Sequence, residues 1–181
     1  MEDFNVIRKR EDIPVEDTWA LEDIYPSDEA WERELLTLDE DKAELESYAG
    51  RLAESGQTLY AYLNKMEQTN KKASSLGNYA MRRSDEDTRN SVYQAMTGRF
   101  MSIAVALDSA CSFESPEIMA IAQQTLDDFY QACPELEHFR RYLTDLRRRK
   151  EHVLSGAEEK LMAAAGEMAQ TPINTFNSFI N

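Results

Sequence analysis

Histidine and cysteine, two of the side chains that bind zinc most often, are scarce in this sequence. Its 181 residues include only the histidines His138 and His152 and the cysteines Cys111 and Cys133. Of these four residues, only Cys133 and His138 lie close together in the chain, and no spacing matches a known zinc-binding pattern. We therefore expect His138 on a helix surface, His152 in a loop, and no metal site.

Sequence motifs of common catalytic and nucleotide-binding sites are also missing. The chain has no G-x-G-x-x-G, no P-loop, no G-x-S-x-G and no H-E-x-x-H. Adjacent carboxylates such as Glu158–Glu159 and Asp127–Asp128 do not indicate an acid–base site, because such pairs are common among 34 acidic residues. A general acid also needs a desolvated environment. We expect no catalytic, cofactor-binding or metal-binding residue here, and an inactive isolated chain.

Basic charge is in short supply, with 20 lysines and arginines against 34 acidic residues and a formal net charge of −14. Residues 1–60 hold 18 acidic and 6 basic side chains, which argues against a nucleic-acid partner because phosphates would be repelled. One basic cluster stands out: Arg140, Arg141 and Arg147–Lys150. It could bind a peptide carboxylate or an acidic surface, or it could be a solvated helix end that pairs with the acidic first part of the chain.

Long hydrophobic runs are absent as well. Apolar runs such as Ile103–Leu107 fall far short of the roughly 18 residues that cross a bilayer. The first twelve residues, MEDFNVIRKRED, contain no apolar signal region, and two cysteines provide no disulfide framework. We therefore expect a cytoplasmic protein without a membrane partner.

Helical periodicity is what the sequence does contain, and it is clearest between Asp87 and Phe113. Apolar residues recur there at steps of three and four, which places them on one face of a helix. These residues are Val92, Met96, Phe100, Ile103, Leu107 and Ala110. From Phe100 to Leu107 the other faces are apolar or small too, so we expect neighbouring elements to enclose this helix on all sides.

Similar patterns predict further helices before and after this one. Capping residues and prolines set their expected starts. The expected ranges are 28–52, 57–83, about 115–133, 134–150, 155–170 and 171–180. Asn70 falls on the apolar stripe of the second of these, where we interpret it as a hydrogen-bonded core amide. No strand-like alternation is present, so we predict an all-α fold, a multi-helix antiparallel bundle of about seven helices.

The expected domain organisation is simple. Residues 1–26 are predicted to be an extended arm that docks on the bundle, because Trp19, Leu21, Ile24 and Tyr25 are too apolar for a free tail. Residues 27–181 are predicted to form one helical lobe.

Several segments resemble the oligoendopeptidase F family of zinc metallopeptidases. The longest is Thr18-Trp19-x-Leu21-Glu22-Asp23-Ile24-Tyr25-Pro26-Ser27-Asp28-x-x-Trp31. The others are Tyr79-Ala80-Met81, Ser112-Phe113-x-x-Pro116-Glu117-Ile118, Arg149-Lys150-x-His152-x-Leu154-Ser155-x-x-Glu158-Glu159 and Asn174-Thr175-Phe176. Their order and spacing match the family along most of the chain.

The resemblance implies a longer parent protein with a catalytic domain after this region. In the family, that domain carries an H-E-x-x-H helix that binds zinc. This chain would be the N-terminal helical lobe, part of the wall of a channel that admits short peptides. The implied partners are the missing catalytic domain and, in the parent, short peptide substrates, with zinc in the parent and no cofactor here.

This assignment has one testable consequence and one alternative. If the lobe is separated from its catalytic domain, apolar residues such as Ile173, Phe176, Phe179 and Ile180 would be uncovered, and we expect the isolated chain to form a dimer. The alternative reading is a free-standing, non-catalytic helical interaction module that has kept the family scaffold.

Overall fold

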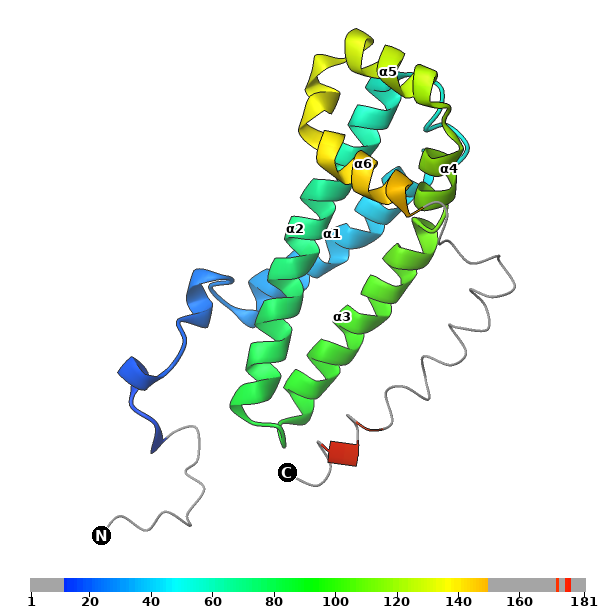
Figure 1. The fold of residues 1–181 in the computed structure, drawn as a ribbon. Helices are drawn as coiled ribbons and strands as arrows, with labels where there is room; N and C mark the ends of the chain where they lie inside the picture. Colours follow the sequence, from blue (N-terminus) through cyan, green and yellow to red (C-terminus); the bar gives the residue numbers. More distant parts are fainter. Residues whose placement is uncertain (1–11, 150–171, 173–174, 177–181) are drawn as a thin grey trace. The chain divides into compact units, whose positions relative to one another are not determined.

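The computed structural model describes residues 12–149, 172 and 175–176 (Figure 1). Helices and turns, and no strands, make up this described part, which confirms the all-α prediction. The chain divides into two units, residues 1–140 and 141–181, and each is considered by itself.

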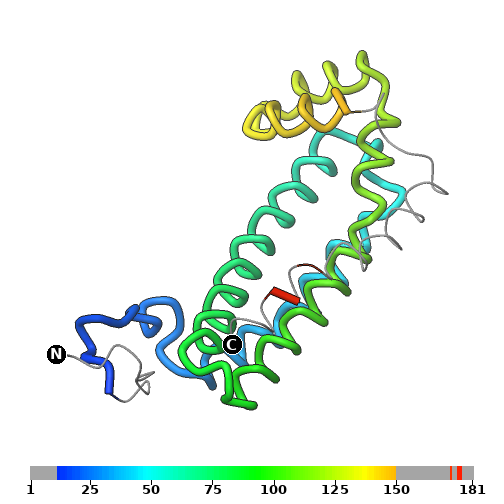
Figure 2. The backbone as a smooth tube through the Cα atoms, turned by 60° about the horizontal axis from the view of Figure 1, so that its bottom comes forward, coloured from blue at the N-terminus to red at the C-terminus, as the bar shows by residue number. Residues whose placement is uncertain are grey.

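The first unit is built on three long helices that pack on one another: α1 (Asp28–Glu46), α2 (Gly56–Glu86) and α3 (Ser91–Ala110). Figure 2 shows these three helices running side by side. A polar side chain caps the start of each: Ser27, Ser55 and Asn90 accept backbone N–H hydrogen bonds at distances of 3.0–3.3 Å. These caps supply acceptors to N–H groups that the first helical turn leaves unpaired.

Shorter elements complete the first unit. The 3₁₀ turns η2 (Val15–Asp17) and η3 (Leu21–Asp23) lie in the N-terminal segment, and α4 (Glu114–Ala120), α5 (Gln123–Ala132) and η4 (Pro134–Phe139) follow α3. Helix α5 and η4 both pack against α2. The second unit contributes most of α6 (Arg140–Arg148), and the predicted helices 155–170 and 171–180 fall largely outside the described residues.

The main core joins the N-terminal segment to α1, α2 and α3. Its buried side chains are Leu21, Trp31, Leu35, Leu38, Leu76, Tyr79, Ala80, Met96 and Phe100. Leu21 of η3 is buried in this cluster and Tyr25 packs against it, whereas Trp19 and Ile24 are exposed. The division into an arm of residues 1–26 and a lobe of residues 27–181 stays a prediction.

The expectation for the central helix is partly wrong. Met96, Phe100 and Leu107 are buried, but Ile103 and Ala110 are only half-buried and Val92 is exposed. Because α1 and α2 cover only one side of α3, Met101 and Val105 on its outer side remain 46% and 65% exposed. The helix is therefore not enclosed on all sides.

Two other helix predictions are corrected by the way the chain turns. Helix α1 ends at Glu46, well before residue 52, and the following loop contains Gly50 with a φ of 79°, a conformation that favours glycine. The helix expected over 115–133 breaks after Ala120. A straight helix would point Ile121 and Leu126 in different directions, whereas the break allows both to be buried.

The helix expected over 134–150 also has two parts, because residues 134–139 form the 3₁₀ helix η4 and α6 follows. In α2 the register differs slightly from the expected stripe. Asn70 is exposed and is no core amide, and the buried polar residue of this turn is the adjacent Thr69. Residues 12–149 contain six α-helices, against about seven expected for the whole chain, because two of the expected helices lie largely outside the described residues.

Candidate functional site

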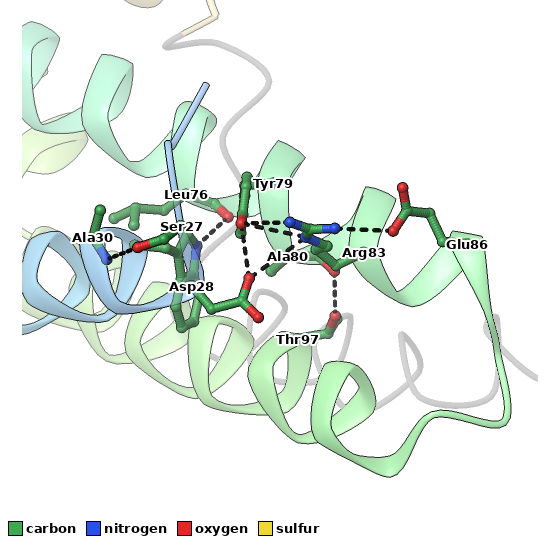
Figure 3. A network of polar contacts seen from close by, with 10 residues as sticks. Ser27, Asp28, Ala30, Leu76, Tyr79, Ala80, Arg83, Glu86 and Thr97 are labelled. Atoms are coloured by element: carbon green, nitrogen blue, oxygen red, sulfur yellow. Dashed lines mark hydrogen bonds and ion pairs between the residues drawn. The ribbon is translucent and has the colours of Figure 1, made fainter. Parts of the chain in front are cut away.

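One polar network of the first unit surrounds Tyr79, at the contact of α1 and α2 (Figure 3). The Tyr79 hydroxyl donates to Asp28 Oδ1 at 2.8 Å and accepts from Arg83 Nη2 at 3.1 Å. Arg83 also bonds Glu86 through Nη1 at 3.2 Å. Nearby, Trp31 Nε1 donates to the Leu76 carbonyl at 2.9 Å, so α1 and α2 are joined twice.

The pKa shifts in this network indicate a structural role and not a catalytic one. Burial raises the pKa of Tyr79, so its hydroxyl keeps its proton at neutral pH. Burial opposes the charge of Arg83, but its hydrogen bonds to Tyr79 and Glu86 outweigh that cost and raise its pKa further. A protonated phenol beside a permanently charged guanidinium offers neither a general base nor a nucleophile.

A second polar cluster lies between α1 and α2 around the buried carboxylate of Asp41. Lys72 Nζ bonds Asp41 Oδ2 at 2.6 Å, and Lys65 Nζ lies 2.9 Å from Asp41 Oδ1. Lys72 also donates to Thr37 Oγ1 at 2.9 Å, and Lys65 also pairs with Glu44 at 2.5 Å. The charges are satisfied within the cluster, which again is typical of a structural brace.

The sequence analysis missed this cluster, although a signal was present. The apolar stripe of α1 runs through Leu38 and Leu45 and skips the turn between them, where Asp41 occupies the inward position. Lys65 and Lys72 stand seven residues apart, on one face of α2. An acidic gap in one stripe opposite two such lysines is a recognisable pattern.

The two cysteines, Cys111 and Cys133, are both free and buried. Burial raises the pKa of the Cys111 thiol and, likewise, of the Cys133 thiol. Near Cys111, the Tyr62 hydroxyl donates to Glu114 Oε2 at 2.8 Å. The Sγ atom of Cys133 lies 3.6 Å from Glu135 Oε2. Protonated, buried thiols are poor nucleophiles and poor metal ligands.

His138 lies on the surface of η4, as expected, with Nε2 3.5 Å from Glu67 and its ring edge-on to Phe139. His152 lies outside the described residues. Within residues 12–149, 172 and 175–176, no group of three or more His, Cys, Asp or Glu side chains is arranged to hold a metal ion.

The basic cluster is not a single patch of unpaired charge. Arg140 makes a double contact with Glu137, at 2.5 and 2.8 Å, and its guanidinium lies 3.9 Å from the Tyr130 ring centroid. In the second unit, Arg141 lies 3.8 Å from Asp145. Lys150 is outside the described residues. The acidic partners of Arg140 and Arg141 are local, and neither belongs to the acidic first part of the chain with which this cluster was expected to pair.

Comparisons with known proteins give one consistent result. The family described as Oligopeptidase F matches residues 117–181. Oligopeptidase PepF of Bacillus subtilis is 36% identical over 98% of this chain, and the plasmid-encoded oligoendopeptidase F of Lactococcus lactis subsp. cremoris is 32% identical over 96% of it. The crystal structure of oligoendopeptidase F from Enterococcus faecium aligns with 83% of this chain at 27% identity and a TM-score of 0.69.

Each match covers only part of the relative. The chain spans 26% of the Bacillus protein, 29% of the Lactococcus protein and 30% of the Enterococcus chain. The match extends along nearly all of this sequence, including the long helices that carry the two polar clusters. The chain therefore belongs to the oligoendopeptidase F family, in which it corresponds to the N-terminal region.

Proposed function

We propose that this chain is the N-terminal helical lobe of a zinc-dependent oligoendopeptidase that hydrolyses short peptides. The observation that carries the proposal is the 36% identity to Oligopeptidase PepF over 98% of the chain. In the parent protein the lobe forms part of the wall of the substrate channel, and the catalytic domain is its partner.

The described residues support a scaffold role for the lobe. The Tyr79 network and the Asp41 cluster each join helices α1 and α2 through several hydrogen bonds and ion pairs. A channel wall must keep its shape while substrates pass, and such cross-links restrict the relative movement of packed helices. Among the described residues, no group of three or more His, Cys, Asp or Glu side chains is placed to hold a metal ion. We assign the zinc of the parent to the H-E-x-x-H helix that the family resemblance implies for the catalytic domain.

The proposal also covers the cellular location and the partners of the parent protein. No helix within the described ranges is long and apolar enough to cross a membrane. We propose that the parent acts on short peptides in the cytoplasm and that neither nucleic acid nor a membrane is its partner.

The test begins with the reading frame that encodes this sequence. An H-E-x-x-H motif within several hundred residues after Asn181 supports the proposal, whereas a stop codon directly after Asn181 supports the free-standing interaction module. The polypeptide that includes the downstream region should cleave short peptides, and a zinc chelator should abolish the cleavage. Replacing the glutamate of H-E-x-x-H by glutamine should also abolish it, because this residue would be the general base.

A further inference from the structure

The N-terminal segment and the last turn of α2 line a half-open cavity of about 300 Å³. Its apolar wall consists of Ile13, Trp19 and Leu21, and its polar wall includes Asp17 and Asp85. The volume lies at the small end of the range for ligand sites, so it suits one side chain better than a whole peptide. All of its lining belongs to the first unit.

Trp19 is the unusual member of this lining. Its side chain is 76% exposed, although Leu21, two residues later, is buried in the main core. Tryptophan is among the residues most often found as binding anchors. The indole is held in place, since the Arg82 guanidinium lies 5.5 Å from its ring centroid.

The charges around the cavity favour a cationic ligand group over an anionic one. Three carboxylates line it, those of Asp17, Asp85 and Glu86, and the guanidinium of Arg82 lies beside them. Glu86 is already paired with Arg83, which bonds it at 3.2 Å. Arg82 already donates to Asp85 at 2.9 Å. The net negative potential would repel an anionic group and attract a cationic one.

We propose that this cavity is an accessory site for one arginine or lysine side chain of a peptide. The aliphatic stem would lie along Trp19 and Ile13, and the cationic head group would lie among the carboxylates. Arginine and lysine combine an apolar stem with a charged tip in this way. The proposal is independent of the catalytic assignment, because it concerns only residues of the described first unit.

The two tryptophans provide a direct experiment with an internal control. Trp31 is fully buried and its indole N–H bonds the Leu76 carbonyl, whereas Trp19 borders the cavity. In ¹H–¹⁵N spectra of the chain, acetyl-Ala-Arg-Ala-amide should shift the Trp19 indole signal and leave the Trp31 signal in place. We expect half-saturation on the order of 1 mM, in keeping with one exposed contact, and no shift with acetyl-Ala-Gln-Ala-amide.

Variants distinguish binding in the cavity from general charge attraction to the chain. The double variant Asp17→Asn, Asp85→Asn should weaken binding by about threefold to tenfold, and higher salt should do the same to the unaltered chain. Glu16→Gln is the matched control, because Glu16 is an exposed neighbour that does not line the cavity. An unchanged Trp31 signal shows that each variant is folded.

Three results would overturn the proposal. The first is an equal response to the arginine and glutamine peptides. The second is unchanged affinity in the double variant. The third is binding that appears only after Arg8, Lys9 and Arg10 are replaced by glutamine, which would mean that the chain's own basic residues occupy the site.

Discussion

At the scale of single residues, Asp41 is the side chain whose role is most sharply defined by its surroundings. It is 8% exposed and lies between the ammonium groups of Lys65 and Lys72. Removing one charge of such a buried ion pair leaves the opposite charge without its partner. The resulting loss of stability is larger than the net contribution of the intact pair. The stability of the α1–α2 contact should therefore depend on this carboxylate.

We predict that Asp41→Asn lowers the free energy of unfolding by about 1–3 kcal/mol. Urea denaturation at pH 7 measures the change. The matched control is Asp39→Asn, since Asp39 lies on the same helix and contacts only Lys42, at 3.3 Å, from an exposed position. The control should change stability by less than about 0.5 kcal/mol; equal losses in the two variants would contradict the prediction.

The same residue predicts a pH dependence. Burial disfavours the charged form of Asp41, but hydrogen bonds from Lys72 and Lys65 outweigh burial and hold its pKa below the usual range. A pKa that is lower in the folded state stabilises the protein above the unfolded pKa, about 3.9. The stability difference between the unaltered chain and Asp41→Asn should therefore be largest near neutral pH and should shrink as the pH falls below about 4.

At the scale of elements, the contact of α2 with α3 depends on a glycine. A Cβ atom at Gly77 would lie 2.7 Å from Cε1 and 2.8 Å from Cζ of Phe100. Phe100 is buried, so its ring has little room to move away. The absence of a side chain at residue 77 thus allows the two helices to approach closely.

We predict that Gly77→Ala destabilises the chain by about 1–2 kcal/mol, because the gain in helix propensity is smaller than the cost of overpacking. Gly98→Ala is the matched control on α3, since nothing lies within 4 Å of its added Cβ. That variant should be more stable by about 0.5–1 kcal/mol. Thermal unfolding of both variants measures the difference, and a stabilised Gly77→Ala would show that the helices can separate at no cost.

Helix α4 holds the loop between α1 and α2 through one carboxylate. Glu117 accepts backbone hydrogen bonds from the Gly50 N–H at 2.5 Å and the Leu52 N–H at 3.2 Å. Leu52, a residue of this loop, is fully buried. The charged acceptor therefore satisfies two loop amides that the ends of the helices leave without partners.

We predict that Glu117→Gln lowers stability by about 1–2 kcal/mol, because the amide accepts with one oxygen and carries no charge. Hydrogen exchange of the Gly50 and Leu52 amides should become faster at the same time. Glu54→Gln is the control, because Glu54 contacts only Arg51 at the surface. Unchanged exchange at both amides would refute this role for Glu117.

At the scale of the whole molecule, α3 presents an uncharged outer face. Exposed residues of this face include Ala95, Gly98, Met101, Ser102, Val105 and Ala106, and the exposed charged residues Arg99 and Asp108 lie at its two edges. Charged residues make up 30% of the chain, so six neighbouring positions without a charge are unusual on its surface. In the second unit, Phe176 is also exposed. Apolar surface of this kind favours self-association.

We predict that the isolated chain dimerises at micromolar concentrations, as sedimentation velocity would show. Met101→Lys combined with Val105→Lys should shift it towards the monomer, because burying two lysines in an interface is costly. The exposed α1 residue Leu36 offers a control in Leu36→Lys, which should leave the dimer intact. A clean monomer of the unaltered chain at high micromolar concentration would contradict the prediction.

We also predict that the isolated chain binds no stoichiometric zinc and cleaves no short peptide. Metal analysis after dialysis and a peptide-cleavage assay measure these two properties. One tightly held zinc ion per chain would contradict the assignment of the metal to residues outside this chain.

Much of the fold follows from local patterns in the sequence. The spacing of Trp31, Leu35 and Leu38 predicts helix α1, and Ser27 and Ser55, residue types that favour helix starts, cap α1 and α2. Such signals are local, because side chains three or four residues apart share a helix face whatever surrounds the helix. The family, too, was recognisable from the order of short segments such as Thr18–Trp31, and the similarity to curated relatives confirms it.

The tertiary structure alone decided which apolar positions are covered and which polar ones are paired. Val92 and Val105 belong to apolar stretches as clear as that of Met96, yet α1 and α2 cover only Met96. Likewise, Asp41 is one acidic residue among 34 until α2 places Lys65 and Lys72 beside it. Periodicity specifies a helix face, but only the packing of distant segments against that face determines what it buries and which charges meet there.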